Sequence, residues 1–61
     1  MTDADFAAQC ERDSLSGRAL DPAEMERLYR LAGHTGGLPP YRMAYPPLWE
    51  MIAAAKRRCA R

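Results

Sequence analysis

Residues 33–47, with the sequence GHTGGLPPYRMAYPP, divide the chain because they cannot form a continuous helix. The segment contains three glycines and four prolines, and both residue types disfavour the interior of a helix. Yet Leu38, Tyr41, Met43 and Tyr45 make the segment too apolar for a disordered linker. We therefore predict an ordered, partly extended loop whose apolar side chains lie over the helices, with prolines that lower the entropy cost of ordering it.

The composition of the chain favours helices on both sides of this loop. There is no valine and a single isoleucine, Ile52, whereas strands favour β-branched and aromatic residues. Alanine, leucine, methionine, arginine and glutamate dominate instead, and these residues favour helices. We predict one all-α domain over residues 1–61, built from three helices at about 3–15, 22–32 and 46–59.

The first predicted helix is weakly amphipathic. Thr2 or Asp3 can cap its N-terminus, where acidic residues also interact favourably with the helix dipole. Gly17 is a suitable stop because glycine tolerates the left-handed conformation. The narrow, small-residue stripe of this helix consists of Phe6, Ala7, Cys10 and Ser14.

The second predicted helix has the strongest local signals. Residues 21–24, Asp-Pro-Ala-Glu, place a cap acceptor, a first-turn proline and a glutamate in the order of a capping box. Leu20 and Met25 are spaced for a hydrophobic staple across that cap, and Glu26 and Arg30 for an i,i+4 ion pair. The apolar face of this helix consists of Met25, Leu28, Tyr29 and Ala32.

The third predicted helix has an apolar face and a second patch beside it. The apolar face consists of Leu48, Met51, Ile52, Ala55 and Cys59. Trp49 is rotated from Ile52 by roughly 60° at about 100° per residue. This helix can therefore bury one face and still expose a patch around Trp49.

A chain of 61 residues is near the lower size limit for a domain and offers little room for catalysis. Cys10, Asp13 and His34 could be combined into a triad, but a domain this small can hardly build a ligand cavity of roughly several hundred Å³. Two cysteines and one histidine do not make a spaced set of metal ligands. We predict a protein that is not an enzyme and has no metal and no cofactor.

The first residues, MTDADF, lack the basic and apolar regions of a secretory signal, and no apolar run is long enough to span a bilayer. A short, alanine-rich apolar face also argues against binding to a membrane surface. We expect a cytoplasmic protein in which Cys10 and Cys59 are reduced, with a disulfide between them as the alternative.

The charges are unevenly distributed, although the net charge is only +1. Residues 1–31 carry seven acids and four bases, and residues 32–61 carry one acid and five bases. A small DNA-binding transcriptional regulator could use the basic C-terminal helix to contact phosphates. The residues for this second hypothesis are Lys56, Arg57, Arg58 and Arg61. The apolar start of that helix and the connection of about thirteen residues before it depart from a helix-turn-helix, which has three or four.

Aromatic, arginine and methionine side chains are concentrated where the loop joins the third helix. Interface hot spots favour tryptophan, tyrosine and arginine, and methionine suits adaptable contacts. Any one of these residues is more typical of a core, but three short helices offer too little interior for all of them. The predicted contact residues are Tyr41, Arg42, Met43, Tyr45, Trp49 and Ile52.

These residues predict a protein-binding module, such as an adaptor, an assembly chaperone or an inhibitor of a larger protein. The basic C-terminus would steer an acidic partner toward it. A core this small seldom supplies more than about 3–5 kcal/mol of net stability alone, so a homodimer is a further expectation. The small size and the alanine- and arginine-rich composition are similar to those of small proteins of bacterial mobile elements.

Overall fold

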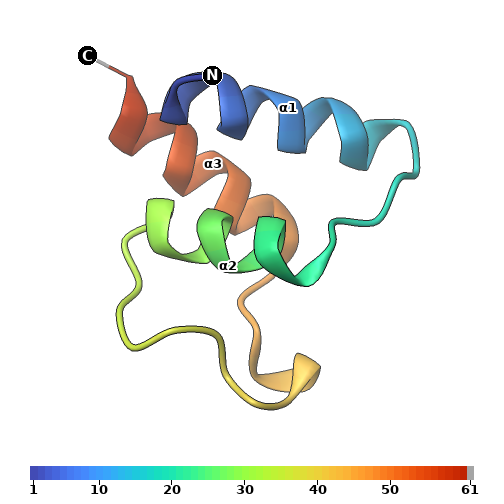
Figure 1. Ribbon diagram of the computed structural model, residues 1–61, viewed down its shortest axis with the longest axis vertical. Helices are drawn as coiled ribbons and strands as arrows, with labels where there is room; N and C mark the ends of the chain where they lie inside the picture. Colours follow the sequence, from blue (N-terminus) through green and yellow to red (C-terminus); the bar gives the residue numbers. More distant parts are fainter. Residues whose placement is uncertain (61) are drawn as a thin grey trace.

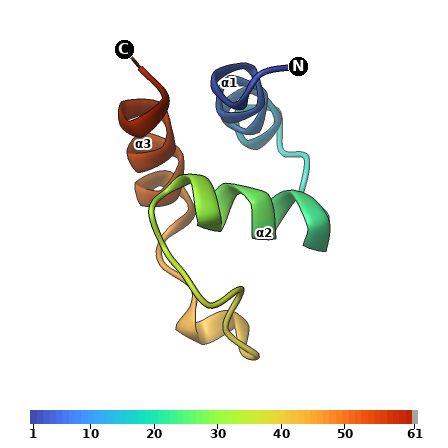
Figure 2. The same ribbon diagram turned by 60° about the vertical axis from the view of Figure 1, so that its left-hand side comes forward.

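The computed structural model describes residues 1–60 and has three α-helices and one short 3-10 helix. In chain order the elements are α1 (Asp3–Leu15), α2 (Pro22–Leu31), η1 (Arg42–Ala44) and α3 (Leu48–Cys59). Helices α1 and α3 run side by side in opposite directions, and α2 packs across them (Figures 1 and 2). The prediction of an all-α, three-helix fold is confirmed.

Two capping boxes start α1 and α2. The Thr2 hydroxyl accepts a 3.2 Å hydrogen bond from the Asp5 backbone N–H, and the Asp5 carboxylate accepts one of 3.2 Å in return. The hydrogen bond from the Thr2 backbone N–H lowers the pKa of the Asp5 carboxyl. At α2, Asp21 and Glu24 exchange the equivalent bonds at 2.8 and 3.0 Å. The predicted box at Asp21 is therefore confirmed, and α1 begins with a second one at Thr2.

Helix α3 begins at Leu48, two residues later than predicted. Pro47 is the cap, with an extended backbone (φ −54°, ψ 136°), and its carbonyl accepts hydrogen bonds from the N–H groups of Glu50 and Met51. Pro46 precedes another proline, and a residue in that position is sterically disfavoured in the helical region. Two consecutive prolines therefore delay the helix start. Helix α2 ends one residue early, with Ala32 as its cap.

The core lies where the apolar faces of the three helices meet. It contains Phe6, Ala7 and Cys10 from α1, Leu28 from α2, Met51, Ile52 and Ala55 from α3, and Leu20 from the α1–α2 connection. Ala7 on α1 and Ala55 on α3 are fully buried, so both helices contribute small side chains to this core. Leu20 is buried and Met25 packs against the core, as expected for a staple across the α2 cap.

The loop before α3 differs from the prediction that its apolar side chains cover the helices. Leu38 and Tyr45 are partly buried, but Tyr41 is 73% exposed and Met43 is 98% exposed. The cause is η1, which turns residues 42–44 into a short projection away from the helices (Figure 1). The loop therefore presents Tyr41 and Met43 to solvent.

None of the helices within residues 1–60 is long and apolar enough to cross a membrane. Cys10 and Cys59 are both free thiols, so the alternative of a disulfide between them does not hold in this structure.

Candidate interaction surface

Trp49 lies in the first turn of α3 and is half exposed beside a buried face. It is 49% exposed, whereas Met51 and Ile52 are 2% and 1% exposed. Successive residues of an α-helix point about 100° apart, so Trp49 falls next to the core face and outside it. The predicted second patch on this helix is present.

A groove of about 260 Å³ lies on one side of Trp49. It is formed by the end of α1, the connection over residues 17–20, the start of α2 and η1 with the start of α3. Besides Gly17, Arg18 and Ala19 of that connection, it is lined by Ser14, Leu20, Met25, Arg42, Leu48 and Trp49. We call it the Trp49 groove. A smaller hollow of about 90 Å³ shares three of these residues and adds Pro22 and Tyr45.

A second hollow, of about 300 Å³, lies on the other side of Trp49, between α1 and α3. Ala53 helps to form it because a methyl side chain leaves space between larger neighbours. We call it the α1–α3 hollow. Its lining residues are Glu11, Trp49, Ile52, Ala53, Lys56 and Arg57. The Trp49 side chain thus lines both concave surfaces and separates one from the other.

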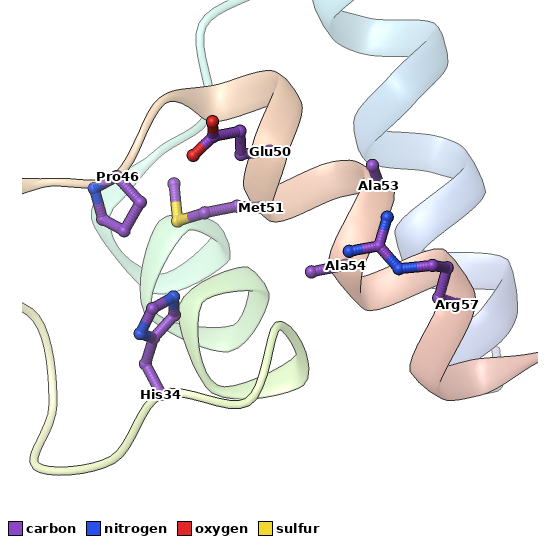
Figure 3. A pocket seen from close by; sticks show the side chains of 7 residues that line it. All are labelled: His34, Pro46, Glu50, Met51, Ala53, Ala54 and Arg57. Carbon is purple, nitrogen blue, oxygen red and sulfur yellow. The ribbon is translucent and has the colours of Figure 1, made fainter.

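A third hollow, of about 380 Å³, lies where the loop after α2 faces α3. Figure 3 shows His34 reaching in from the loop, with Glu50 and Arg57 on different turns of α3 and Ala54 between them. The His34 ring stacks on Tyr29, with centroids 4.5 Å apart and an interplanar angle of 13°. This hollow is therefore lined by both a negative and a positive side chain and does not favour a ligand of either charge.

Four of the eight lysine and arginine side chains within residues 1–60 are engaged in ion pairs. Arg18 bridges Asp13 on α1 and Glu24 on α2, at 2.7 and 3.2 Å. The other pairs are Arg27–Asp3 at 3.0 Å, Arg30–Glu26 at 2.9 Å and Lys56–Glu11 at 2.9 Å. The Arg30–Glu26 pair confirms the predicted i,i+4 interaction.

Arg12, Arg42, Arg57 and Arg58 form no ion pair within residues 1–60. The guanidinium of Arg58 packs against Gly33 at the end of α2, close enough that a Cβ there would lie 3.1 Å from Nη1. Arg42 lines the Trp49 groove, and Arg57 lines the α1–α3 hollow. One unpaired arginine therefore lies on each side of Trp49.

The predicted contact residues are only partly brought together. Arg42 and Trp49 line the same groove, and Tyr45 lines the adjoining hollow. Tyr41 and Met43 are exposed on the loop. The assignment of Ile52 as a contact residue is corrected: its side chain is 1% exposed and belongs to the core, because it lies on the buried face of α3.

The residues of the nucleic-acid hypothesis do not form one basic face. Lys56, Arg57 and Arg58 are consecutive in a helix and point about 100° apart. Lys56 is paired with Glu11, Arg57 lines two hollows and Arg58 packs on Gly33. Arg61 lies outside the described residues.

Within residues 1–60, no side-chain hydrogen bond joins Cys10, Asp13 and His34 to one another. Burial raises the pKa of the Cys10 thiol to about 11, with a further contribution from the charge of Glu24, and this disfavours the nucleophilic thiolate. The Asp13 carboxylate accepts hydrogen bonds from Gln9 and Arg18. Within residues 1–60, no three His, Cys, Asp or Glu side chains are grouped so that they could hold a metal ion.

Ser14 is a groove residue that the sequence analysis did not identify as functional. Its Oγ is buried and has no hydrogen-bond partner among the described residues. In the sequence, the feature that could have drawn attention to Ser14 is its position. It places a hydroxyl at the end of the apolar stripe of α1, where an apolar residue would complete the stripe. A buried hydroxyl without a partner is uncommon in folded proteins.

Comparisons with known protein families, with curated proteins and with solved structures find no match for this chain. The function is therefore inferred from the Trp49 groove, the charges around it and the exposed loop.

Proposed function

We propose that this chain is a non-enzymatic protein-binding module that docks its partner at the Trp49 groove. The observation that carries the proposal is the half-exposed Trp49 ring between two hollows. Tryptophan is among the residues most enriched at binding hot spots, especially where it can enter a well-packed contact. Leu20, Met25 and Leu48 supply apolar walls for such a contact.

The walls of the groove are held in place before any partner arrives. Arg18 ties the end of α1 to the start of α2 through Asp13 and Glu24, and the Asp21 cap fixes where α2 begins. A surface that is already ordered loses less conformational entropy on binding. This rigidity supports a specific docking site.

The same proposal covers the roles of adaptor, assembly chaperone and inhibitor, which differ only in what the partner does. Two free thiols suit the reducing conditions of the cytoplasm.

A homodimer is a further proposal, supported by the small core and by the exposed Trp49. Sedimentation at several concentrations tests it, and a monomer throughout would contradict it.

Affinity purification from the native cell, followed by mass spectrometry, tests the docking proposal. The baits are the unchanged protein, Trp49→Ala and Leu15→Ala. Leu15 is a matched control because it is 72% exposed and does not line any of the hollows described above. We expect Trp49→Ala alone to lose a partner that the other two baits retain, while circular dichroism shows all three helical. Equal capture by all three baits would contradict the proposal.

The two unpaired arginines at positions 57 and 58 favour one alternative, a small DNA-binding regulator. A gel shift at about 150 mM salt tests it, because phosphate contacts weaken steeply with salt. Binding that Arg57→Ala with Arg58→Ala abolishes would support it. Absence of any shift would remove it.

A further inference from the structure

Two arginines that line the hollows beside Trp49 lack an ion-pair partner. Among the charged side chains of the Trp49 groove and the α1–α3 hollow, Arg18, Glu11 and Lys56 are paired, whereas Arg42 and Arg57 form no ion pair within residues 1–60. Guanidinium groups are hydrogen-bond donors only. Both arginines can therefore bind an acceptor-rich ligand that lies against Trp49.

We propose that the segment docked at this surface is acidic and amphipathic. Its apolar side chain lies in the Trp49 groove, and carboxylates on either side of that side chain pair with Arg42 and Arg57. This inference rests on the proposed function and names the chemistry of the partner.

Within residues 1–60, no acid of the chain forms an ion pair with either of these two arginines. Asp13 and Glu24 are engaged by Arg18, which lines the groove together with Arg42. Glu11 is engaged by Lys56 in the hollow that Arg57 lines. The other charges that line these two hollows are thus already paired, and Arg42 and Arg57 remain as the unpaired positive groups on the two flanks of Trp49. Glu50 shares only the third hollow with Arg57. Arginine binds carboxylates through two parallel hydrogen bonds, which makes such a pair geometrically selective.

The positions of the arginines set the pattern of the partner. Arg57 follows Trp49 by eight residues, which is about 12 Å along α3 at 1.5 Å per residue. Arg42 lies on the other side, on η1. A matching segment therefore has a large apolar residue with an acidic residue on each side, one of them about two helical turns away if the segment is helical.

The apolar groove argues for a peptide over a nucleic acid. Leu20, Met25 and Leu48 line the groove. A nucleic acid has no aliphatic side chain that could fill such a surface. A base could still stack on Trp49, since aromatic rings bind single strands in this way. A single-stranded oligonucleotide is therefore included as a competing probe.

The test is a selection of displayed random peptides of about 16 residues on the full chain, a length that spans the groove and both arginines. Synthetic copies of the enriched peptides are then titrated by calorimetry against single variants. We expect enriched peptides with net negative charge and a large apolar residue between acids. Arg42→Gln and Arg57→Gln should each weaken binding about fivefold or more, a change of roughly 1 kcal/mol.

Two further variants separate a specific effect from a general one. Arg12→Gln removes the same charge from an exposed arginine of α1 that hydrogen-bonds Gln9 and does not line any of the described hollows, so it should leave binding unchanged. Ser14→Ala should also leave binding unchanged, because the Ser14 Oγ is buried beneath the groove surface. Loss of binding in Arg12→Gln equal to that in Arg42→Gln would overturn the inference, because it would reflect net charge alone.

The outcomes distinguish the inference from the function beneath it. The variants Trp49→Phe and Trp49→Ala test whether the enriched peptides require Trp49. If these peptides require Trp49 but are neutral or basic, the acidic partner is overturned and the docking function stands. Tighter binding of the oligonucleotide than of any peptide would overturn the acidic partner. Peptides that bind both Trp49 variants as well as the unchanged protein, or no enrichment at all, would overturn both.

Discussion

The guanidinium of Arg27 lies 4.3 Å from the centroid of the Phe6 ring. Nη2 of the same side chain donates a 3.0 Å hydrogen bond to the carboxylate of Asp3. A single residue of α2 thus contacts α1 through both a cation–π interaction and an ion pair. Because α1 and α2 each pack mainly on α3, Arg27 is a principal direct link between them.

Arg27→Ala should lower the free energy of unfolding by about 1 kcal/mol. An exposed cation–π contact contributes roughly 0.5–1 kcal/mol, and an exposed ion pair contributes about 0–1 kcal/mol. Urea unfolding followed by circular dichroism measures the change. Arg12→Ala serves as the control, because the side chain of that arginine hydrogen-bonds Gln9 within α1. Equal losses in the two variants would show that the link to α1 has no energetic weight.

Leu28→Ala should leave the protein largely unfolded. Leu28 is fully buried where α2 meets the other helices, and such a truncation costs about 2–5 kcal/mol. A core of this size provides only about 3–5 kcal/mol in total. Thermal unfolding measured by circular dichroism tests this, with Leu15→Ala as an exposed control. A cooperative transition near that of the unchanged protein would contradict the expectation.

Gly33→Ala should destabilise the fold more than Gly17→Ala. Both glycines have positive φ angles, +101° and +86°, and side chains in that region cost about 1–2 kcal/mol. At Gly17 the new methyl group meets open space, whereas at Gly33 it meets the Arg58 guanidinium. Comparing the two melting temperatures tests this. A larger effect at Gly17 would contradict the packing of Arg58.

Ser14→Ala should leave the stability unchanged or raise it. A buried hydroxyl without a partner costs about 1–3 kcal/mol, and alanine removes that cost. Ser16→Ala is the matched control, because its Oγ donates a 3.0 Å hydrogen bond to the Asp13 carbonyl and its loss should be slightly destabilising. Urea unfolding of both variants decides the point. A larger loss for Ser14→Ala would mean that its hydroxyl is satisfied.

The stability should fall as the pH rises from about 9 to about 11, because burial raises the pKa of the Cys10 thiol from 9.0 to about 11. In the unfolded chain the thiol loses its proton first, so the stabilisation is fully present below pH 9 and is lost as the pH approaches the folded pKa. Unfolding of Cys10→Ala over the same pH range is the comparison, since other groups titrate equally in both proteins. If the free energy of unfolding of both proteins depended on pH in the same way, the raised pKa of Cys10 would be contradicted.

Much of the fold could be predicted from local chemistry. The Asp21–Glu24 capping box, the i,i+4 pair and the apolar face of α3 all depend on residues within one or two helical turns of each other, and they formed as expected. The position of Trp49 beside the core face also follows from helix periodicity alone.

The groove itself could not be predicted, because its walls come from segments that are distant in sequence. Nothing local indicates that Arg42 lines the same surface as Ser14, or that Lys56 pairs with Glu11 across 45 positions. The exposed positions of Tyr41 and Met43 depend on η1, whose turn forms among prolines without a side-chain cap. The burial of Ile52 could be predicted, because helix periodicity places this residue on the apolar face of α3.

The antiparallel arrangement of α1 and α3 brings both described ends of the chain to the same end of the molecule, away from η1 (Figure 1). Trp49 and Cys59 occupy opposite ends of α3, about 15 Å apart along the axis at 1.5 Å per residue. A fluorophore, an immobilisation tag or a tethered peptide attached before Asp3 of α1 should therefore leave the Trp49 groove unobstructed. The Trp49 groove and the first residues of α1 thus lie at opposite ends of the molecule.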